Sequence, residues 1–333
     1  MPREAMETAR VALFAGRPDQ AYRLLLLAQP ELGHDPGWLD LAARIYLALD
    51  RPLRQAECYA DLGAGDPRSL AKVSAILERQ GIRGGPPSFS PGPPAWPSLD
   101  RQFLKAVQRI APAVDGGAYL LTDAALVRIK PDGSILSRQP LADPLDMCLD
   151  ESGRPVVLTE HQLLWGETSV ALPRGMYRPA SACASPDGNL LLLDRGSKRL
   201  YRITPEGTLA GSIAIDLREP DRVRTDPAGR IYLADRASGT VHLFTPDMVP
   251  IRVIDPREAG RPVRKLEDLF VDFAGDLLLL DGSSHELVMI NAAGRVAAAS
   301  GERAGRVDAA GWDGLSNLLV LSRREPDLRR ISP

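Results

Sequence analysis

Four fifteen-residue segments between residues 145 and 281 share one frame, and this repeat constrains the fold more than any other feature. Each has a short apolar strand, an Asp or Ser, a turn that ends in glycine, and a second apolar strand that ends in Asp or Thr. The segments are LDMCLDESGRPVVLT (145–159), ASACASPDGNLLLLD (180–194), DRVRTDPAGRIYLAD (221–235) and EDLFVDFAGDLLLLD (267–281). Gly117 in DGGAYLLTD and Ser316 in GLSNLLVLS extend the series to six units of roughly 40 residues.

The second strand of these units is apolar at nearly every position, as in LLLLD, so both of its faces must be buried. Parallel α/β sheets bury both faces too, but they need helical crossovers, and these units offer glycine turns instead. Third strands such as LYRI and fourth strands such as TLAGSIA complete each unit. Four short strands per repeat are typical of a propeller blade. We therefore predict an all-β, six-bladed propeller over residues 98–333.

Residues 1–83 have a different periodicity, with apolar residues three and four apart, which predicts a short α-helical repeat domain. Three residues, Ala9, Arg10 and Leu13, recur 34 residues later as Ala43, Arg44 and Leu47. Thirty-four residues is the tetratricopeptide period, and the segment resembles that family, although Asp35-Pro36 comes about three residues late. A generic pair of helical hairpins remains the alternative interpretation of this segment. Two repeats and a fifth helix fall short of the usual three units, so another surface must cover one end.

Between these parts, residues 84–97 read GGPPSFSPGPPAWP, with six prolines and three glycines. Such a segment favours extended polyproline II and predicts a semi-rigid linker. Because Phe89 and Trp96 are apolar, a linker pinned against one domain is the alternative.

The frame of the second part resembles the NHL repeat, and Asp226 to Asp235 match it almost throughout. This resemblance also implies a propeller, with degenerate first and last blades. The last blade lacks its outer strand in the sequence, and an open sheet edge invites aggregation. We expect Arg101 to Arg109, RQFLKAVQR, to fill that place and close the ring.

Several residue sets are candidates for chemistry, and we assign no catalytic, cofactor-binding or metal-binding residue from them. The aspartates that end the second strands are expected to accept N–H bonds of the following turns. The histidines fall at different offsets from the repeat glycines, which argues against a metal triad. Cys148 and Cys183 share one offset in adjacent first strands; we interpret them as small buried hydrophobes, with a thiol pair near the axis as the alternative. The sets are Asp123, Asp194, Asp235 and Asp281, and His34, His161, His242 and His285.

Two functional alternatives rest on resemblance to other propellers. Lactonase-like propellers carry a central Glu, Asn and Asp cluster that the first strands here lack. Virginiamycin-lyase-like propellers use a histidine and a glutamate near a metal, for which His161 and Glu160 are the nearest counterparts. RNA-binding NHL domains use a basic face, and basic residues do concentrate here between 218 and 265. Acidic residues alternate with them, which indicates a solvated surface. They are Arg218, Arg222, Arg224, Arg252, Arg257, Arg261, Arg264 and Lys265.

Composition bears on the partners and the cellular location of the protein. The chain has 41 Lys and Arg against 43 Asp and Glu, so no overall basic field attracts nucleic acid or anionic lipid. Its apolar runs are far shorter than the roughly 20 residues that span a bilayer, and no secretory signal is evident. We expect no cofactor and a bacterial cytoplasmic location. The favoured hypothesis is a non-enzymatic scaffold within a larger assembly, binding proteins through the helical groove and the propeller loops; a metal-dependent hydrolase or lyase and an RNA-binding propeller are the alternatives.

Overall fold

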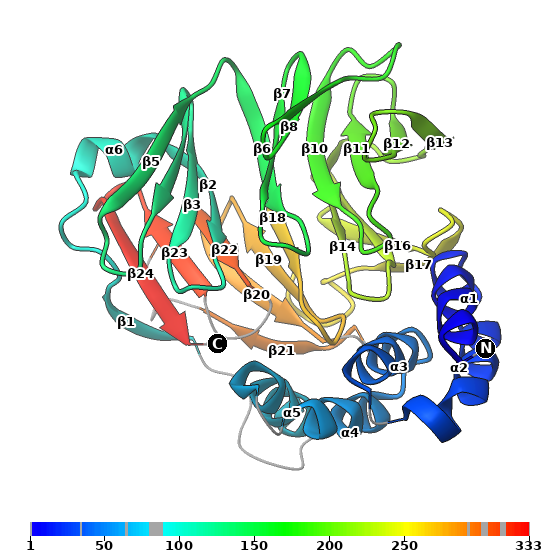
Figure 1. Cartoon of the computed structure of the whole chain (residues 1–333). Coiled ribbons are helices and arrows are strands. Elements are labelled where there is room, and N and C mark those ends of the chain that lie inside the picture. The colour runs from blue at the N-terminus through cyan, green and yellow to red at the C-terminus, as the bar shows by residue number, and fades with distance from the viewer. Residues whose placement is uncertain are drawn as a thin grey trace.

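The computed structural model describes residues 2–33, 35–63, 66–79, 89–291, 294–300, 306–313 and 318–332. It is a six-bladed β-propeller preceded by five helices, and each blade is a four-stranded antiparallel sheet (Figure 1). This confirms the predicted fold class and blade number.

The strands of blades one to three, from the axis outward, are β2 (Val107–Pro112), β3 (Ala118–Thr122), β4 (Ala125–Ile129) and β5 (Ile135–Pro140); β6 (Pro144–Leu149), β7 (Pro155–Thr159), β8 (Gln162–Trp165) and β9 (Thr168–Ala171); and β10 (Pro179–Ala184), β11 (Leu190–Asp194), β12 (Arg199–Ile203) and β13 (Leu209–Ala214). Those of blades four to six are β14 (Pro220–Thr225), β15 (Ile231–Asp235), β16 (Thr240–Phe244) and β17 (Pro250–Ile254); β18 (Leu266–Val271), β19 (Leu277–Asp281), β20 (Glu286–Ile290) and β21 (Val296–Ala299); and β22 (Ala309–Trp312), β23 (Leu318–Ser322), β24 (Asp327–Ser332) and β1 (Ser90–Pro94).

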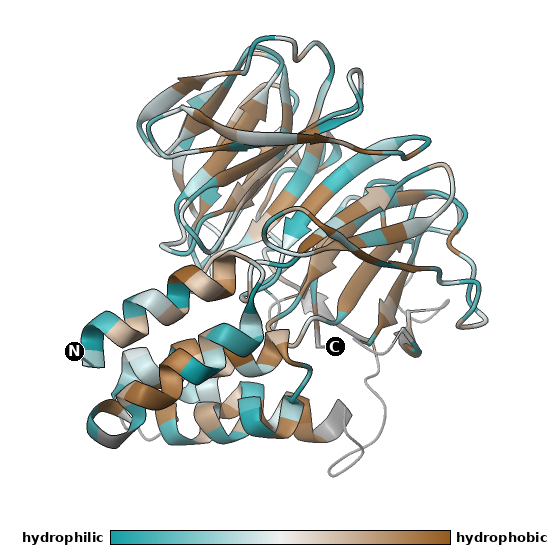
Figure 2. Ribbon diagram, turned by 90° about the vertical axis from the view of Figure 1, so that its right-hand side faces the viewer, coloured by the Kyte–Doolittle hydropathy of each residue, from teal (hydrophilic) through white to brown (hydrophobic). Residues whose placement is uncertain are grey.

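The second strand of each blade carries the core, as its sequence predicted. All five residues of β11, β15 and β19 are buried, because neighbouring blades cover both faces of each sheet. Clusters of buried Leu, Val and Ile side chains fill the spaces between adjacent blades. Figure 2 shows the same distribution as brown runs along the propeller strands.

The strand that closes the ring is not the predicted one. Arg101–Ala106 forms helix α6, whose N-cap Asp100 accepts a hydrogen bond from the N–H of Phe103, and Val107 starts the inner strand of blade one. Strand β1 pairs antiparallel with β24 instead, with an irregular register between Pro91 and Pro94. Proline can occupy an edge strand because its missing N–H withdraws no donor from a central ladder. The proline-rich segment thus closes the sixth blade.

Aromatic residues on either side of β1 hold this closing segment on the propeller. Phe89 is buried against blades five and six, and Trp96 is buried against blade one. The Trp96 indole Nε1 donates to the carbonyl of Pro131 at 3.1 Å. The alternative of a segment pinned against a domain therefore holds for residues 89–96, whereas residues 84–88 lie outside the described part of the chain.

The helical region consists of two antiparallel hairpins and a fifth helix, and each helix begins with proline at its first position. Proline suits this position because its fixed φ is helical and its missing N–H needs no partner there. Buried alanines, including Ala9, Ala21 and Ala43, let paired helices approach closely. The helices are α1 (Pro2–Phe14), α2 (Pro18–Leu32), α3 (Pro36–Ala48), α4 (Pro52–Leu62) and α5 (Pro67–Arg79).

The helical region packs on the propeller through the turn between β18 and β19. Phe273 in this turn is buried in the helical core and meets Tyr59 edge-on, with ring centroids 5.9 Å apart. The buried Gln55 side chain donates to the carbonyl of Phe273 at 2.8 Å. A second contact joins Arg44 Nη1 and Glu151 Oε1 at 2.7 Å. The end of the helical repeat is therefore covered by the chain's own propeller.

Candidate functional site

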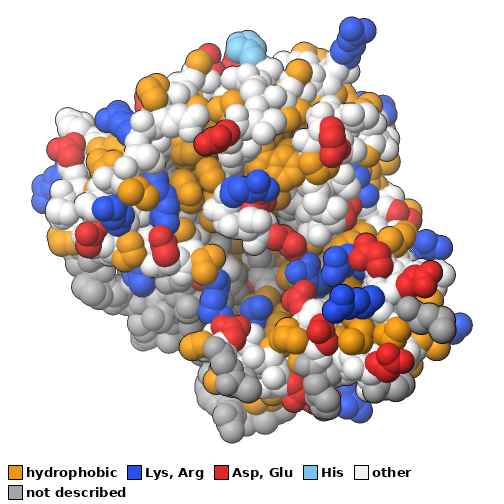
Figure 3. All heavy atoms as spheres, in the orientation of Figure 1, with side chains coloured by type: hydrophobic (Ala, Val, Ile, Leu, Met, Phe, Trp, Pro, Cys, Tyr) orange, Lys and Arg blue, Asp and Glu red, His pale blue; other side chains and the backbone are white. Residues whose placement is uncertain are grey.

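Two cavities lie at opposite ends of the inner strands. The first, of about 570 Å³, is lined by the last residues of those strands and by helices α3, α4 and α5. We call it the inter-region cavity. The second, of about 550 Å³, is lined by the first residues of β10, β14 and β18 and by loops of the face away from the helices. We call it the outer cavity. Figure 3 shows acidic and basic side chains side by side where the helical region, at the lower right, borders the propeller.

An ionic cluster near the propeller axis separates the two cavities. Asp146, which is fully buried, lies 3.3 Å from both Arg109 Nε and Arg224 Nη1 and accepts the hydroxyl of Ser181 at 2.5 Å. Asp268 lies 3.4 Å from Arg224 Nη2 and 3.5 Å from Arg222 Nε. We call this cluster the axial network; its members are Arg109, Asp146, Ser181, Arg222, Arg224 and Asp268.

The axial network joins five blades through mutually satisfied charges. Burial lowers the pKa of Arg224, but the carboxylates of Asp146 and Asp268 outweigh this effect and raise it above its ordinary value. The guanidinium is therefore charged at any physiological pH. Because Asp146 and Asp268 already accept hydrogen bonds or face arginine, neither carboxylate of the network is a free general base.

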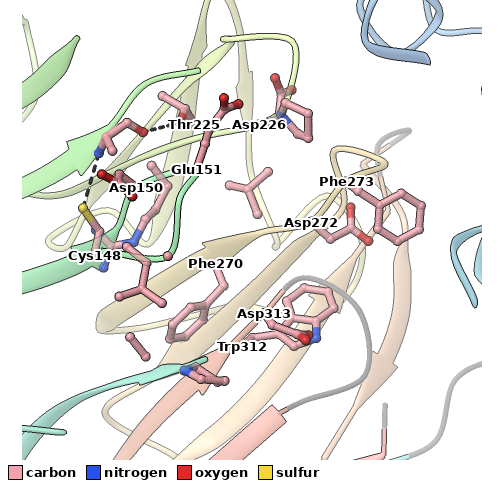
Figure 4. A pocket seen from close by; sticks show the side chains of 18 of the residues that line it. Cys148, Asp150, Glu151, Thr225, Asp226, Phe270, Asp272, Phe273, Trp312 and Asp313 are labelled. Carbon is pink, nitrogen blue, oxygen red and sulfur yellow. Dashed lines mark hydrogen bonds between the residues drawn. The ribbon is translucent and has the colours of Figure 1, made fainter. Parts of the chain in front are cut away.

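Two further polar side chains, the half-buried Lys72 and the buried Trp312, line the inter-region cavity. The Lys72 ammonium lies 4.4 Å from the centroid of the Tyr59 ring, and burial holds the pKa of this lysine below its usual value. Trp312, which is 8% exposed, has its indole Nε1 without a hydrogen-bond partner in the described part of the chain. Phe270, Phe273 and Trp312 border the cavity on one side, as Figure 4 shows.

The two cysteines of the first strands meet at the floor of the inter-region cavity. The neighbouring Cys183 side chain raises the pKa of Cys148, and the neighbouring Cys148 side chain lowers that of Cys183 to about 7. Burial opposes the second shift, and the charge of Arg224 supports it. Both side chains are free thiols, and Cys183 is the more buried of the two. The predicted burial therefore holds for Cys183, whereas Cys148 is only half-buried; the thiol pair stays the alternative interpretation.

The aspartates at the ends of the second strands have the structural role predicted for them in three blades. Asp194 accepts the N–H of Ser197, and Asp235 accepts that of Ala237. Asp281 likewise accepts the N–H of Ser283, and all three also bind N–H groups of the segment entering their own blade. In blade one Thr122 Oγ1 takes this place, while Asp123 is exposed.

The three histidines in the described residues have separate surroundings, as their offsets predicted, and His34 lies outside those residues. His242 is 3.2 Å from Thr240 Oγ1, and His285 Nδ1 is 3.2 Å from an Asp308 oxygen. His161 has exposed Asp143 and Glu160 as neighbours, with one ligand atom of each within 4.8 Å of the others. This group could bind a divalent cation through two carboxylates and an imidazole.

Five of the eight basic residues named between 218 and 265 are held in ion pairs. Arg222 and Arg224 belong to the axial network, and outside it Arg257 pairs with Asp255 and Arg261 with Glu286. Lys265 pairs with Glu267 at 3.0 Å. The alternation of charge in the sequence thus becomes local ion pairing.

Sequence reasoning missed the axial network, although a signal for it exists. Asp146, Ser181, Arg222 and Asp268 each lie seven residues before the glycine of their unit, at Gly153, Gly188, Gly229 and Gly275. A shared offset places these polar residues at the same level of adjacent inner strands. Comparison of polar residues at equal offsets would have found four of the six members, but not Arg109 and Arg224.

The fold defines the class of protein: a six-bladed propeller with an N-terminal helical repeat region. Several solved structures have a similar propeller. No protein-family model matches the chain, and no curated protein matches it. Virginiamycin B lyase from Staphylococcus aureus is similar with a TM-score of 0.53 and 13% identity, over 68% of this chain and 80% of that chain. An auxiliary nutrient binding protein from Bacteroides ovatus has a TM-score of 0.56 and 10% identity, over 69% of each chain. A protein of unknown function from Bacteroides caccae has a TM-score of 0.53 and 15% identity, over 61% of this chain and 85% of that chain.

At these identities the likeness extends to the fold and not to the activity. Within the described residues, no helix has the length and apolar character needed to cross a membrane.

Proposed function

We propose that the chain is a non-enzymatic scaffold that binds other proteins through surfaces outside the inter-region cavity. Two features of the site support this. The charged groups at the axis are paired with one another, and Phe273 of the β18–β19 turn is buried in the helical core. The two regions then act as one body within a larger assembly.

The observation that carries this proposal is an apolar stripe beside the outer strand of blade four. Val249, directly before β17, and Ile251 and Val253 within it occur at alternate positions, and their side chains are 52%, 47% and 52% exposed. The outer edge of β17 pairs with no other strand among the described residues. Exposed apolar stripes and free strand edges are typical protein-binding surfaces.

The neighbouring helices extend this surface. Gly16, in the turn between α1 and α2, packs against Asp247 in the β16–β17 turn. Leu27 on α2 is 70% exposed. A partner that covers β17 can therefore reach the helical region as well.

The test is a quantitative binding measurement with a partner isolated from the native host. Ile251→Asp should weaken binding at least ~10-fold, since a desolvated interface position is worth about 1.4 kcal/mol or more. Leu209→Asp is the matched control, because Leu209 is 51% exposed on the outer strand of blade three, away from the stripe. Equal affinities for the two variants would contradict the proposal.

A metal-dependent lyase or hydrolase is the second candidate, favoured by the group of Asp143, Glu160 and His161 at the rim of the outer cavity. Two carboxylates and an imidazole suit Mn²⁺ or Zn²⁺. Calorimetric titration with each ion tests it. Binding that His161→Ala abolishes and His242→Ala retains would favour this candidate, and no binding heat at millimolar metal would exclude it.

A further inference from the structure

We propose that Cys148 and Cys183 form a peroxide-reactive thiol pair, in which Cys183 is oxidised first and Cys148 then closes a disulfide between blades two and three. The proposal starts from placement. The two residues lie on adjacent inner strands, β6 and β10, which pack against each other, and both line the inter-region cavity.

The surroundings of Cys183 favour a thiolate through a nearby cation. Its sulfur lies 3.6 Å from Thr225 Oγ1, and while protonated it donates to the Ala184 carbonyl at 3.3 Å. The Arg224 guanidinium adds a positive charge on the same side of the cavity. A thiolate next to a cation is the reactive form of cysteine.

Cys148 is placed to complete the reaction. Its sulfur accepts the N–H of Ala184 at 3.3 Å, so it lies against β10 at the residue that follows Cys183. Figure 4 shows this bond and the bond from Thr225 Oγ1 to the Ala184 carbonyl as dashed lines on the same peptide segment. Its raised pKa keeps Cys148 protonated while Cys183 reacts first.

The chemistry balances with hydrogen peroxide as the oxidant. The Cys183 thiolate attacks one peroxide oxygen, the S–O bond forms, the O–O bond breaks, and the departing hydroxide takes a proton to become water. Cys148 then loses its proton to solvent and attacks the sulfenic sulfur; the S–S bond forms and a second hydroxide leaves as water. Two thiols and one peroxide give one disulfide and two waters.

The third cysteine provides an internal control. Cys58 lies buried in α4, and burial together with nearby carboxylates raises its pKa to about 12. At neutral pH a smaller fraction of Cys58 than of Cys183 is therefore thiolate, and Cys183 should react with peroxide measurably faster than Cys58.

The experiment treats the full chain with hydrogen peroxide, alkylates the remaining thiols and maps them by mass spectrometry. The expected product has lost two hydrogens, joins the Cys148 and Cys183 peptides, and retains an alkylated Cys58. In Cys148→Ser a sulfenic acid at Cys183 should be trapped by a dione, and Cys183→Ser should lose no thiol on this timescale. The wild-type rate of Cys183 alkylation should reach half its maximum near pH 7, and Thr225→Val should shift this midpoint upward.

Three results would overturn the proposal. These are oxidation of Cys58 as fast as Cys183, disulfides only between chains, and no thiol loss in excess peroxide at pH 8. Retained cooperative unfolding of each variant shows that a negative result does not arise from misfolding. None of these outcomes depends on partner binding, so the scaffold proposal and this one fail separately.

Discussion

Replacing Asp146 with asparagine tests whether the axial network stabilises the ring. The substitution keeps the volume of the side chain but removes the charge that faces Arg109 and Arg224. Removing one partner of a buried ion pair costs about 3–5 kcal/mol, because the remaining charge stays desolvated. With an unfolding entropy of about 2.1 cal/mol/K per residue, 333 residues give about 0.7 kcal/mol/K. The melting temperature should therefore fall by about 4–7 °C.

Differential scanning calorimetry at pH 7, with urea unfolding as a second probe, measures this change. Asp123→Asn is the matched control, because Asp123 is exposed, and its free energy of unfolding should stay within about 0.5 kcal/mol of wild type. Arg224→Gln should cost less in the Asp146→Asn background than alone, since the two side chains share one network. A loss below about 1 kcal/mol for Asp146→Asn, or strict additivity with Arg224→Gln, would refute this reasoning.

Three further stability measurements test other parts of the structure. Trp96→Ala should lower the free energy of unfolding by about 3–5 kcal/mol in urea titrations, because it empties a buried site beside the closing strand; a change under 1 kcal/mol would contradict that closure. Gly239→Ala should lower the free energy of unfolding by about 2–4 kcal/mol, because φ is +71° and the new Cβ would overlap the Val263 carbonyl oxygen. Gly153→Ala is the control, since φ is +74° but the space around it is open, and it should cost about 1 kcal/mol. Equal losses would argue against this close approach of Gly239 to Val263. Burial raises the pKa of Asp281, but the Ser283 hydroxyl and backbone N–H donors outweigh it and hold it below its ordinary value. The advantage of wild type over Asp281→Asn, about 1–2 kcal/mol, should therefore be complete at pH 7 and disappear as pH falls below about 4; an advantage that grows in acid would contradict this sign.

The blades and helices could be predicted because their signals are local. The turn glycines of units two to five, such as Gly188 and Gly229, adopt a positive φ within their own units, and each second strand is apolar whichever strand comes after it. Proline starts the helices for an equally local reason. These features repeat, so one unit supports the interpretation of the next.

The closing strand and the axial contacts could not be predicted in the same way, because they join distant parts of the chain. Strand β1 pairs with β24 across the whole propeller, and its proline content indicated a linker. The common offset of Asp146 and Asp268 was readable, but their shared partner Arg224 depends on the ring geometry. Likewise, the insertion of Phe273 among the helices has no local signal.

A double-mutant cycle between Tyr59 and Phe273 tests most directly whether the helical region and the propeller form one body. Tyr59→Ala, Phe273→Ala and the double variant are compared with wild type by urea unfolding. Edge-on aromatic contact across the junction predicts a coupling energy of about 0.5–1.5 kcal/mol, with the double variant less destabilised than the sum of the single ones. Losses that add to within about 0.3 kcal/mol would show that the two rings do not meet, and would contradict the docking on which the proposed scaffold depends.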